Sequence, residues 1–391
     1  MIFVGIDVSK DKHDCCILSQ DGQVLAKPFS VPNSIDGFNV LFAAITSFES
    51  NCAKVKVGLE ATGHYSFNIL GYLLDKDFPC YVFNPLHTNL YRKSLTLRKT
   101  KTDKVDSKII AKMLLSEVDF KPYSKTLYHN EQLKSLSRYR FSKIRERANL
   151  KQQLARLVNI LFPELEKLVS SLHISTVYSL LEELPGASFV AKAHLTRLTN
   201  ILSSNSHGRY KKVKALEIRN AAISSVGCVI PAKSLELKHT IQLIRVLSEE
   251  IEEIDLQIQK IMAQINSPIT SIPGLGINTS AMILSEIGDF TKFDSPDKIL
   301  AFAGVSPSTY QSGKLDNAYA HMEKRGSRYL RYALYNAATY VCKWDKTFAL
   351  YLQKKRSEGK HYFVAISHAI KKLVRVIYHL QLTGDTYKVA A

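Results

Sequence analysis

An apolar side chain returns every three or four residues along IRVLSEEIEEIDLQIQKIMAQI, residues 244–265. The repeat consists of Ile244, Leu247, Ile251, Ile254, Ile258, Ile261 and Ile265. A spacing of about 3.5 residues puts one apolar stripe on an α-helix and is typical of a coiled coil. A shorter upstream run could be its antiparallel partner; it consists of Leu150, Leu154, Leu157 and Leu161. The pattern does not distinguish an intramolecular helix pair from a seam between two copies of the chain.

This helical repeat lies in the middle of three predicted parts. A chain of 391 residues is too long for one small hydrophobic core, so several domains are expected. Residues 1–128 predict an α/β domain, and residues 129–266 predict a helical, coiled-coil region with an inserted helical lobe at about 163–240. Residues 267–391 predict a mostly helical C-terminal domain. We therefore expect an α/β domain followed by all-α parts.

The first part alternates strands and helices. Its predicted strands are residues 2–8, 13–19, 23–31, 55–61 and 80–85, and its predicted helices are residues 35–49, 64–76 and the stretch after Thr102. Asp21 and Gly22 form a hairpin turn signal between the second and third strands. Because the long strands are apolar on both faces, the pattern predicts a mixed sheet covered by helices.

Positive charge is in excess over the whole chain. Lys and Arg total 53 against 35 Asp and Glu, a net charge of +18. Such an excess favours a polyanionic partner, either nucleic acid or an acidic membrane surface. No stretch approaches the roughly 20 apolar residues of a membrane span, and the six cysteines show neither CxxC pairs nor zinc-ligand spacing. We therefore expect a cytosolic protein that binds nucleic acid and no membrane.

The basic residues gather in two runs. Residues 92–112 hold eight Lys or Arg and two acids, and residues 125–161 hold nine and two. A solvated helix face usually mixes both signs, so one-sided runs favour contact with a nucleic-acid backbone over simple solvent exposure. The residues expected to make this contact are Lys99, Lys101, Lys104, Arg138, Arg140, Arg145 and Arg147.

A short glycine motif opens the third part. The sequence Pro-Gly-Leu-Gly, residues 273–276, stands between two helical stretches and resembles the hairpin of a helix-hairpin-helix. In that motif, glycine lets backbone N–H groups approach a phosphate at a helix N-terminus. The pattern makes Gly274 and Gly276 candidate phosphate contacts, and a tight turn inside a helical domain explains the same residues.

Four carboxylates form the candidate catalytic set. Asp7 lies inside the apolar strand IFVGIDV, where an unpaired charge costs on the order of several kcal/mol. Glu60 ends the strand VKVGLE, which the element order puts beside the first strand. Asp103 and Asp106 share one face of the following helix, although capping after Thr102 would by itself explain acids there. Gathered together, the four acids would repel each other, and two Mg²⁺ ions would remove that repulsion and clamp a phosphodiester.

Three motifs in order carry a resemblance to a known family. GIDVSKDK, GLEATGHY and KTDKVDSKIIA together resemble the Asp-Glu-Asp-Asp tetrad of the Piv/MooV-type insertion-sequence transposases. The first domain of that family is similar to the RuvC Holliday-junction resolvase and has an RNase H-like fold. FAGVSPSTYQSGKLDNAYAHMEKRGSRYLRYALY resembles the family's C-terminal transposase domain. The resemblance covers residues 1–125 and 267–391.

The resemblance implies a serine nucleophile. In the family, the serine of the "SG" pair attacks DNA and forms a transient phosphoserine link, and that serine is here Ser312. Its nearby competitors are Ser306, Ser308 and Ser327. The basic residues around the motif are candidate phosphate contacts, although solvent exposure would also explain them; they are Lys314, Lys324, Arg325, Arg328 and Arg331. A weak hydroxyl nucleophile needs a metal or base, which the carboxylate site would supply if the two domains meet.

The resemblance also implies partners. Members of the family are similar to recombinases that are guided by a structured RNA from the element's own non-coding end. We expect this protein to be a homo-oligomer, either a dimer or a tetramer. The expected function is therefore metal-dependent transposition of DNA by a bacterial or archaeal, nucleoid-associated protein. The alternative is a RuvC-like endonuclease that uses a metal-activated water. A sugar-kinase-like ATPase would need a second Gly-rich loop, and a non-catalytic RNA-binding protein would not explain an acid in the first strand.

Overall fold

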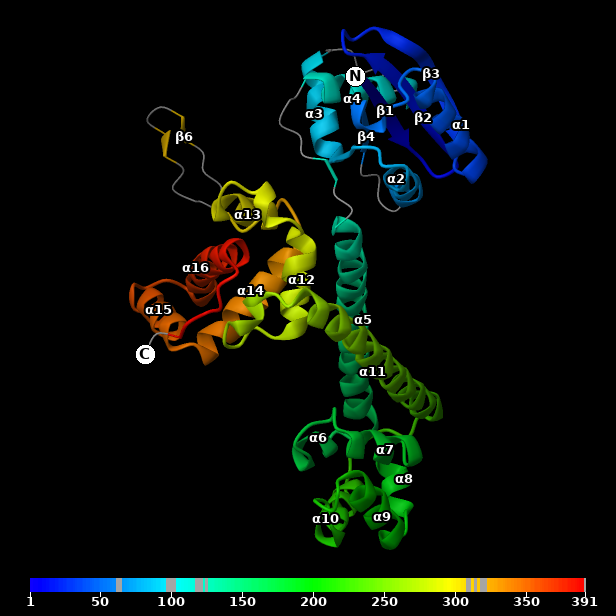
Figure 1. Ribbon diagram of the computed structural model, residues 1–391. Coiled ribbons are helices and arrows are strands. Elements are labelled where there is room, and N and C mark those ends of the chain that lie inside the picture. Colours follow the sequence, from blue (N-terminus) through cyan, green and yellow to red (C-terminus); the bar gives the residue numbers. More distant parts are fainter. Residues whose placement is uncertain are drawn as a thin grey trace. The chain divides into compact units, whose positions relative to one another are not determined.

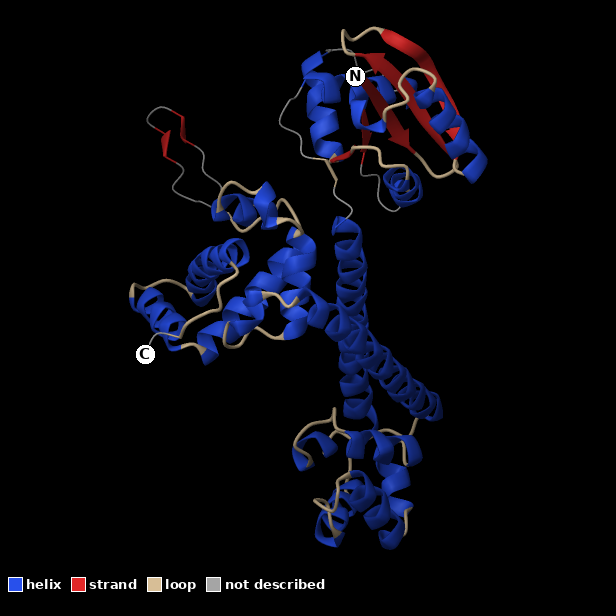
Figure 2. Ribbon diagram, viewed as in Figure 1, coloured by secondary structure: helices blue, strands red, loops and turns tan. Residues whose placement is uncertain are grey.

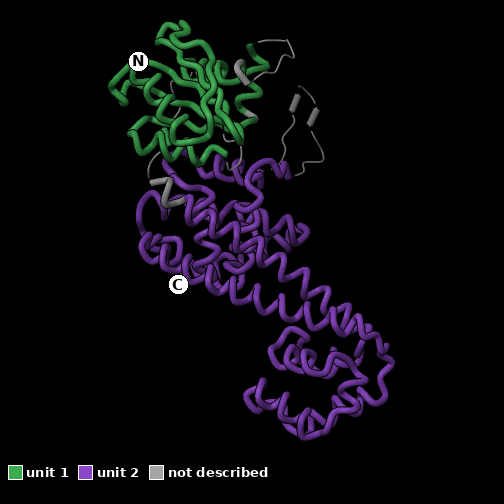
Figure 3. Tube along the Cα trace, turned by 90° about the vertical axis from the view of Figure 1, so that its right-hand side faces the viewer, with its two compact units in different colours: residues 1–129 green, residues 130–391 purple. Residues whose placement is uncertain are grey.

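The chain folds into two compact units, residues 1–129 and residues 130–391 (Figure 3). The computed structural model describes residues 1–60, 65–95, 103–116, 122–123, 126–306, 311–312, 315–316 and 322–389. The long strands are gathered in the first unit, and helices make up most of the second (Figure 2). The predicted combination of an α/β part with helical parts is confirmed. The predicted boundary at residue 266 falls inside the second unit.

A five-stranded mixed sheet forms the centre of the first unit. Its strands are β1 (Ile2–Val8), β2 (Lys12–Ser19), β3 (Val24–Pro32), β4 (Val55–Glu60) and β5 (Cys80–Phe83). The strand order is β3-β2-β1-β4-β5. β1, β2 and β3 pair antiparallel, whereas β4 pairs parallel with both β1 and β5. The predicted mixed sheet is confirmed, with β4 beside β1 as the element order indicated.

Helices cover both faces of this sheet. They are α1 (Ile35–Thr46), α2 (Ser66–Asp75), α3 (Pro85–Leu95) and α4 (Asp103–Ser116). Each face of the sheet has its own hydrophobic core. Alternate residues of β1 belong to one core or the other, because successive side chains of a strand point to opposite faces. Val4 and Ile6 pack with α1 and α2, whereas Phe3 packs with α4. The arrangement is the one expected of an RNase H-like domain.

Helix α3 was not predicted from the sequence. Its segment, PLHTNLYRKSL, begins with proline and continues into the basic run, so it offers few apolar positions from which a helical period can be recognised. A further short element, η1 (Cys52–Lys54), leads into β4. The observed order in the first unit is therefore βββαβαβαα rather than βββαβαβα.

Two long helices run antiparallel in the second unit, α5 (Thr126–Leu161) and α11 (Pro231–Ile265) (Figure 1). Polar side chains join them along their length. The pairs are Arg140 with Asp255, Lys143 with Glu250 at 2.8 Å, Arg147 with Ser248 at 3.0 Å, and Gln153 with Glu236 at 2.9 Å. The leucine run of α5 and the isoleucine repeat of α11 thus belong to one antiparallel pair within the chain.

The isoleucine repeat is divided between two hydrophobic cores. Ile244 packs with Leu154 and Leu157 in the core of the lobe, whereas Ile254 and Ile258 pack into the core of the C-terminal helices. Ile265, at the end of the repeat, is 42% exposed. The chain's own helices therefore bury most of the stripe, and a coiled coil between copies of the chain stays a prediction.

The remaining helices of the second unit form two groups. The lobe between α5 and α11 contains α6 (Leu165–Leu168), α7 (Ser175–Glu183), α8 (Ala187–Lys192), α9 (Leu195–Asn205) and α10 (Lys212–Ile223). After α11 come η2 (Pro268–Ser271), α12 (Ile277–Ile287), η3 (Phe290–Lys292), α13 (Pro296–Ala303), β6 (Gln311–Ser312), β7 (Leu315–Asp316), α14 (Arg328–Trp344), α15 (Lys346–Ser357) and α16 (Tyr362–Thr383). Among the helices in the described ranges, none combines the length and the hydropathy needed to cross a bilayer.

Candidate active site

Two glycines let α4 lie directly on the central strands. Gly5 of β1 and Gly58 of β4 are partners in the parallel register. A Cβ atom on Gly5 would overlap the backbone carbonyl oxygen of Ser107 and the amide nitrogen of Ala111 in α4. A Cβ atom on Gly58 would lie 2.7 Å from the Leu114 side chain. The close approach of helix and sheet therefore depends on the absence of side chains at both positions.

Three of the four predicted carboxylates lie around one pocket. Asp7 and Glu60 each follow these glycines by two residues, so both side chains are on the face of the sheet that α4 covers. Asp106 comes from the first turns of α4. The pocket has a volume of about 320 Å³, and all three half-buried acids line it. Asp103 is the first residue of α4, and its side chain lies outside the described part of the structure.

Helix α3 supplies polar residues to the pocket that no sequence motif indicated. The Thr88 hydroxyl donates a hydrogen bond of 2.7 Å to Glu60 Oε2. The Arg92 guanidinium lies 3.4 Å from Asp106 Oδ1 and donates a bond of 2.9 Å to Asn89 Oδ1. All three residues line the pocket. The one signal that pointed here was the basic run, which begins at Arg92.

The donor set of the pocket suits a hard divalent cation. Carboxylate oxygens are the ligands that Mg²⁺ prefers, and here they come from three elements to one cavity. In the described part of the chain, no group of three His, Cys, Asp or Glu side chains is arranged closely enough to hold a metal ion. Arg92 neutralises Asp106 in this arrangement, so a cation would compete with that guanidinium for the carboxylate.

The predicted nucleophile lies on a short hairpin of the second unit. Ser312 ends β6 and pairs with Leu315 of β7 in an antiparallel register. Its side chain, together with Gly313, Lys314 and the competitor Ser308, lies outside the described residues. Ser306, another competitor, is half-buried, and its backbone carbonyl accepts a bond from Glu323 N.

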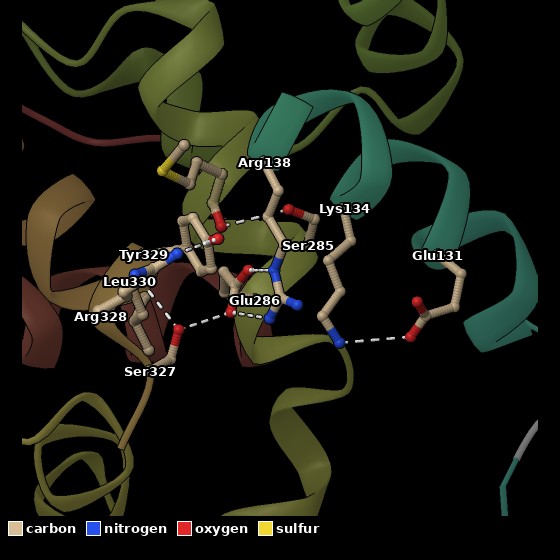
Figure 4. Close-up of polar contacts among 10 residues, drawn as sticks. Glu131, Lys134, Arg138, Ser285, Glu286, Ser327, Arg328, Tyr329 and Leu330 are labelled. Carbon is tan, nitrogen blue, oxygen red and sulfur yellow. Dashed lines mark hydrogen bonds and ion pairs between the residues drawn. The ribbon is translucent and has the colours of Figure 1, made fainter. Parts of the chain in front are cut away.

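The third competitor, Ser327, has a structural role (Figure 4). Its hydroxyl donates to Glu286 Oε2 at 2.6 Å and accepts from the Leu330 backbone N–H at 3.1 Å. The second bond is an N-cap of α14, since a serine oxygen there satisfies a backbone donor that the helix leaves unpaired. Both bonds hold the hydroxyl in place at the start of α14.

Arg138, a predicted nucleic-acid contact, completes this network (Figure 4). Its Nε donates to Glu286 Oε1 at 2.5 Å and its Nη2 donates to Oε2 at 3.0 Å, while its guanidinium lies 4.7 Å from the centre of the Tyr329 ring. Glu286 is 4% exposed. A buried carboxylate is stable only when it is paired and hydrogen-bonded, so Arg138 and Ser327 together join α5, α12 and α14.

The other residues of the basic runs that were predicted to contact a nucleic-acid backbone lie in different surroundings. Arg140 and Arg147 bind partners on α11, whereas Arg145 is exposed with its guanidinium 5.7 Å from the centre of the Phe141 ring. Lys99 and Lys101 lie outside the described residues, as does the side chain of Lys104 on α4. Nucleic-acid contact through this set stays a prediction, for which Arg145 is the exposed member on α5.

The basic residues near α14 are mostly exposed. Lys324, Arg325 and Arg328 are open to solvent, and Arg328 donates a bond of 2.8 Å to the Tyr329 hydroxyl. Arg331 instead donates to the backbone carbonyl oxygens of Ala303 and Lys324, at 3.0 and 3.2 Å. Exposure therefore leaves the first three available to a phosphate, and Arg331 ties the segment before α14 to the end of α13.

The two glycines of the predicted hairpin lie in different environments. Gly274 has φ +84°, and a Cβ atom there would lie 2.8 Å from the Tyr340 carbonyl oxygen, so packing against α14 accounts for it. Gly276 is the N-cap residue of α12, and among the described residues a Cβ atom there would meet open space. Of the two, Gly276 is the one that a phosphate could approach.

Comparison with known proteins identifies relatives over almost the whole chain. Residues 4–163 match a DEDD model of IS110 elements described as "Transposase", and residues 266–353 match the "Transposase IS116/IS110/IS902 family". The chain is 25% identical over 382 residues to an uncharacterized 44.8 kDa protein of insertion element IS116 from Streptomyces clavuligerus, covering 96% of this chain and 94% of the relative. It is 24% identical over 383 residues to a pilin gene-inverting protein of Moraxella bovis, with the same coverage.

Proposed function

The chain belongs to the IS110/IS116/IS902 family of transposases, and on that premise we propose that it moves an insertion sequence by metal-dependent cleavage and exchange of DNA strands. Membership of the family implies recombinase activity on DNA. This proposal rests on the pocket that Asp7 and Glu60 of the sheet and Asp106 of α4 line together. The match to a DEDD transposase model also suggests dependence on a divalent metal.

The residues of the pocket have distinct roles in this proposal. Asp7, Glu60, Asp103 and Asp106 would hold divalent cations, proposed to be two Mg²⁺ ions, which supply charge stabilisation for the attacking and leaving oxygens of a phosphodiester. Thr88 orients the Glu60 carboxylate through its hydrogen bond of 2.7 Å. Arg92 adds a guanidinium that can pair with a phosphate oxygen once Asp106 has another partner.

Ser312 is the proposed nucleophile. Its hydroxyl oxygen forms a bond to the phosphorus while its proton passes to a base. The bond from phosphorus to a deoxyribose oxygen breaks, and that oxygen takes up a proton and leaves as the free hydroxyl of a strand end. The DNA remains joined to the protein, so the energy of the broken bond is kept for rejoining to another strand. Ser312 and the carboxylates belong to different units, and the proposal requires them to meet, within one chain or between protomers of a dimer or tetramer.

The proposed partners are DNA and an RNA encoded by the element. The pilin gene-inverting relative is named for the inversion of a DNA segment, which supports recombination on DNA as the activity of this chain. An RNA encoded by the element is the proposed guide, and the net charge of +18 suits binding of both nucleic acids. The proposed location is the bacterial or archaeal nucleoid, where such substrates lie.

The test uses the element's own ends. Labelled DNA carrying them is incubated with the protein, the RNA transcribed from the element and Mg²⁺, and the reaction is stopped with denaturant. We expect a slower-migrating protein–DNA adduct that is absent with Ser312→Ala and absent in EDTA. Free cut ends without an adduct, at an equal rate for Ser312→Ala, would instead support the alternative, a RuvC-like endonuclease that uses metal-activated water.

A further inference from the structure

We propose that the C-terminal end of the second unit contains a separate binding site for a nucleic-acid phosphate backbone, formed by α15, α16 and the tail that follows Gly384. A cavity of about 720 Å³ lies there, and it is distinct from the carboxylate pocket and from the basic residues discussed above. Binding at this site is a property of the folded second unit, and it holds whether or not the proposed chemistry of Ser312 is correct.

A row of basic side chains on α16 lines this cavity. Lys371, Arg375 and His379 are exposed and recur every four residues, so they lie on one face of the helix. At a rise of 1.5 Å per residue they are about 6 Å apart along the helix axis, comparable to the separation of successive phosphates in a strand. Lys388, on the tail, adds another cation to the lining. A row of basic side chains at this spacing, of which Lys371 and Arg375 carry a charge at neutral pH, suits a linear polyanion.

Nearby acids leave most of this charge uncompensated. Asp297 of α13 lies 3.6 Å from Lys371 and 4.0 Å from Arg375, but each of these side chains is more than half exposed, so the pairs are weak. Asp385 of the tail lies 4.0 Å from His379 Nε2. Of the described residues that line the cavity, one is acidic, Asp385, and four are cationic: Lys371, Lys372, Arg375 and Lys388. The lining therefore carries a net positive charge.

Aromatic rings hold one of the cations against the wall. The Lys372 ammonium lies 5.1 Å from the ring centres of both Phe348 and Tyr351 on α15. Such cation–π contacts fix a side chain that would otherwise be mobile in solvent. Tyr351 also lines the cavity. A combination of cations with an aromatic side chain is typical of surfaces that bind nucleic-acid strands.

The tail forms one wall of the cavity and continues from the end of α16 toward α15 (Figure 1). The Tyr387 hydroxyl donates to Asp345 Oδ2 at 3.0 Å, and the Tyr387 backbone N–H donates to the Ser271 hydroxyl at 2.8 Å. Asp345 is 1% exposed, and it also caps α15 by accepting a bond of 2.9 Å from Phe348 N. These bonds hold Lys388 beside the row on α16.

The test compares two double variants of the full chain. Lys371→Gln with Arg375→Gln removes two charges from the cavity, and Lys211→Gln with Lys212→Gln removes two exposed charges from the lobe. Both are made in the Ser312→Ala background, so that no cleavage accompanies binding. Labelled single-stranded RNA, single-stranded DNA and duplex DNA of one sequence are titrated by fluorescence anisotropy at several salt concentrations, with circular dichroism to check folding.

Loss of two phosphate contacts lowers the slope of log affinity against log salt by about 1.5. We expect this loss for the cavity variant and not for the lobe variant, and the nucleic acid that shows it identifies the ligand as RNA or DNA. Lys388→Gln, which removes one cation from the lining, should give about half of that loss. Equal losses for both double variants would overturn the proposal, as would an unchanged affinity of the cavity variant for all three nucleic acids.

Discussion

Gly5 of β1 faces Gly58 of β4 across the parallel ladder, and each glycine precedes a carboxylate of the candidate active site by two residues. A strand repeats its orientation every two residues, so the glycines and the acids Asp7 and Glu60 share one face. The glycines allow α4 to approach that face, and the acids lie where Asp106 of α4 can reach the same pocket. One spacing, Gly-x-acid in two neighbouring strands, therefore both seats the helix and places the carboxylates.

Gly5→Ala should destabilise the first unit strongly. The new methyl group would meet backbone atoms of α4, which cannot move without shifting the helix, so we expect a loss of about 3 kcal/mol or more in the free energy of unfolding, at the upper end for overpacking. Gly58→Ala should cost less, because side chains that can yield surround it. Urea unfolding followed by circular dichroism measures both.

The matched control for these variants is Gly71→Ala in α2. Among the described residues a Cβ atom there meets open space, and alanine is the better helix former, so a gain of about 0.5 to 1 kcal/mol is expected. A Gly5→Ala protein as stable as Gly71→Ala would contradict the close approach of α4 to the sheet.

Removal of single carboxylates should abolish recombination and leave folding intact. Asp7→Asn, Glu60→Gln and Asp106→Asn each remove one charge from the pocket but keep the size of the side chain and an oxygen that can accept a hydrogen bond, so no cavity is created. Asp75→Asn, an exposed acid at the end of α2, is the control and should keep full activity. The readouts are strand exchange on element ends and the urea midpoint. Full activity of Asp7→Asn would refute the metal-site assignment.

Ser327→Ala should lower stability without abolishing the covalent adduct. The change removes an N-cap of α14 and one hydrogen bond to the buried Glu286, so we expect a loss of about 1 to 2 kcal/mol in the free energy of unfolding. Ser327→Thr keeps the hydroxyl and should therefore retain most of the wild-type free energy of unfolding. Denaturation of both variants is compared with adduct formation below the unfolding transition, and an adduct missing from a folded Ser327→Ala protein would point to Ser327 as the nucleophile.

Truncation of the isoleucine stripe should show whether it packs within one chain. Ile258 is fully buried and Ile251 is 4% exposed, so Ile258→Ala and Ile251→Ala should each cost about 2 to 5 kcal/mol. For packing within the chain, the urea midpoints of wild type and variants are independent of protein concentration. A midpoint that rises with concentration, and loses that rise in the variants, would identify the stripe as a seam between copies.

The tail should detach at alkaline pH. Burial, the hydrogen bond to Asp345 and the charge of Asp345 together raise the pKa of Tyr387 to about 12. Because the folded pKa lies above the ordinary value near 10, the contribution of the tyrosine to stability is complete below pH 10 and is lost as the pH rises toward 12. The difference in unfolding free energy between wild type and Tyr387→Phe should therefore be constant at neutral pH and shrink over that window. A difference independent of pH would contradict the contact with Asp345.

Local pattern predicted much of the fold, because strands, turns and helices leave short periodic signals. The strands of the first unit, the turn at Gly22 and the helical character of the second unit could all be read from neighbouring residues. Helix α3 could not, since its basic segment has few apolar positions. No local pattern therefore predicted Thr88, Asn89 and Arg92 at the pocket. The isoleucine repeat predicted a long helix but not which surfaces would bury it.

The sequence by itself determined which residue types the chain can use: an acid in an apolar strand, a glycine two residues before it, and an excess of positive charge. The tertiary structure decided which partner each charged side chain has and which charged side chains stay exposed. It assigned Arg138 to the buried Glu286 and Arg140 to Asp255, and it left Lys371 and Arg375 exposed on α16. The physical reason is that the fate of a charge depends on neighbours distant in sequence, because only packing sets which partner lies within hydrogen-bonding distance and how far water is excluded.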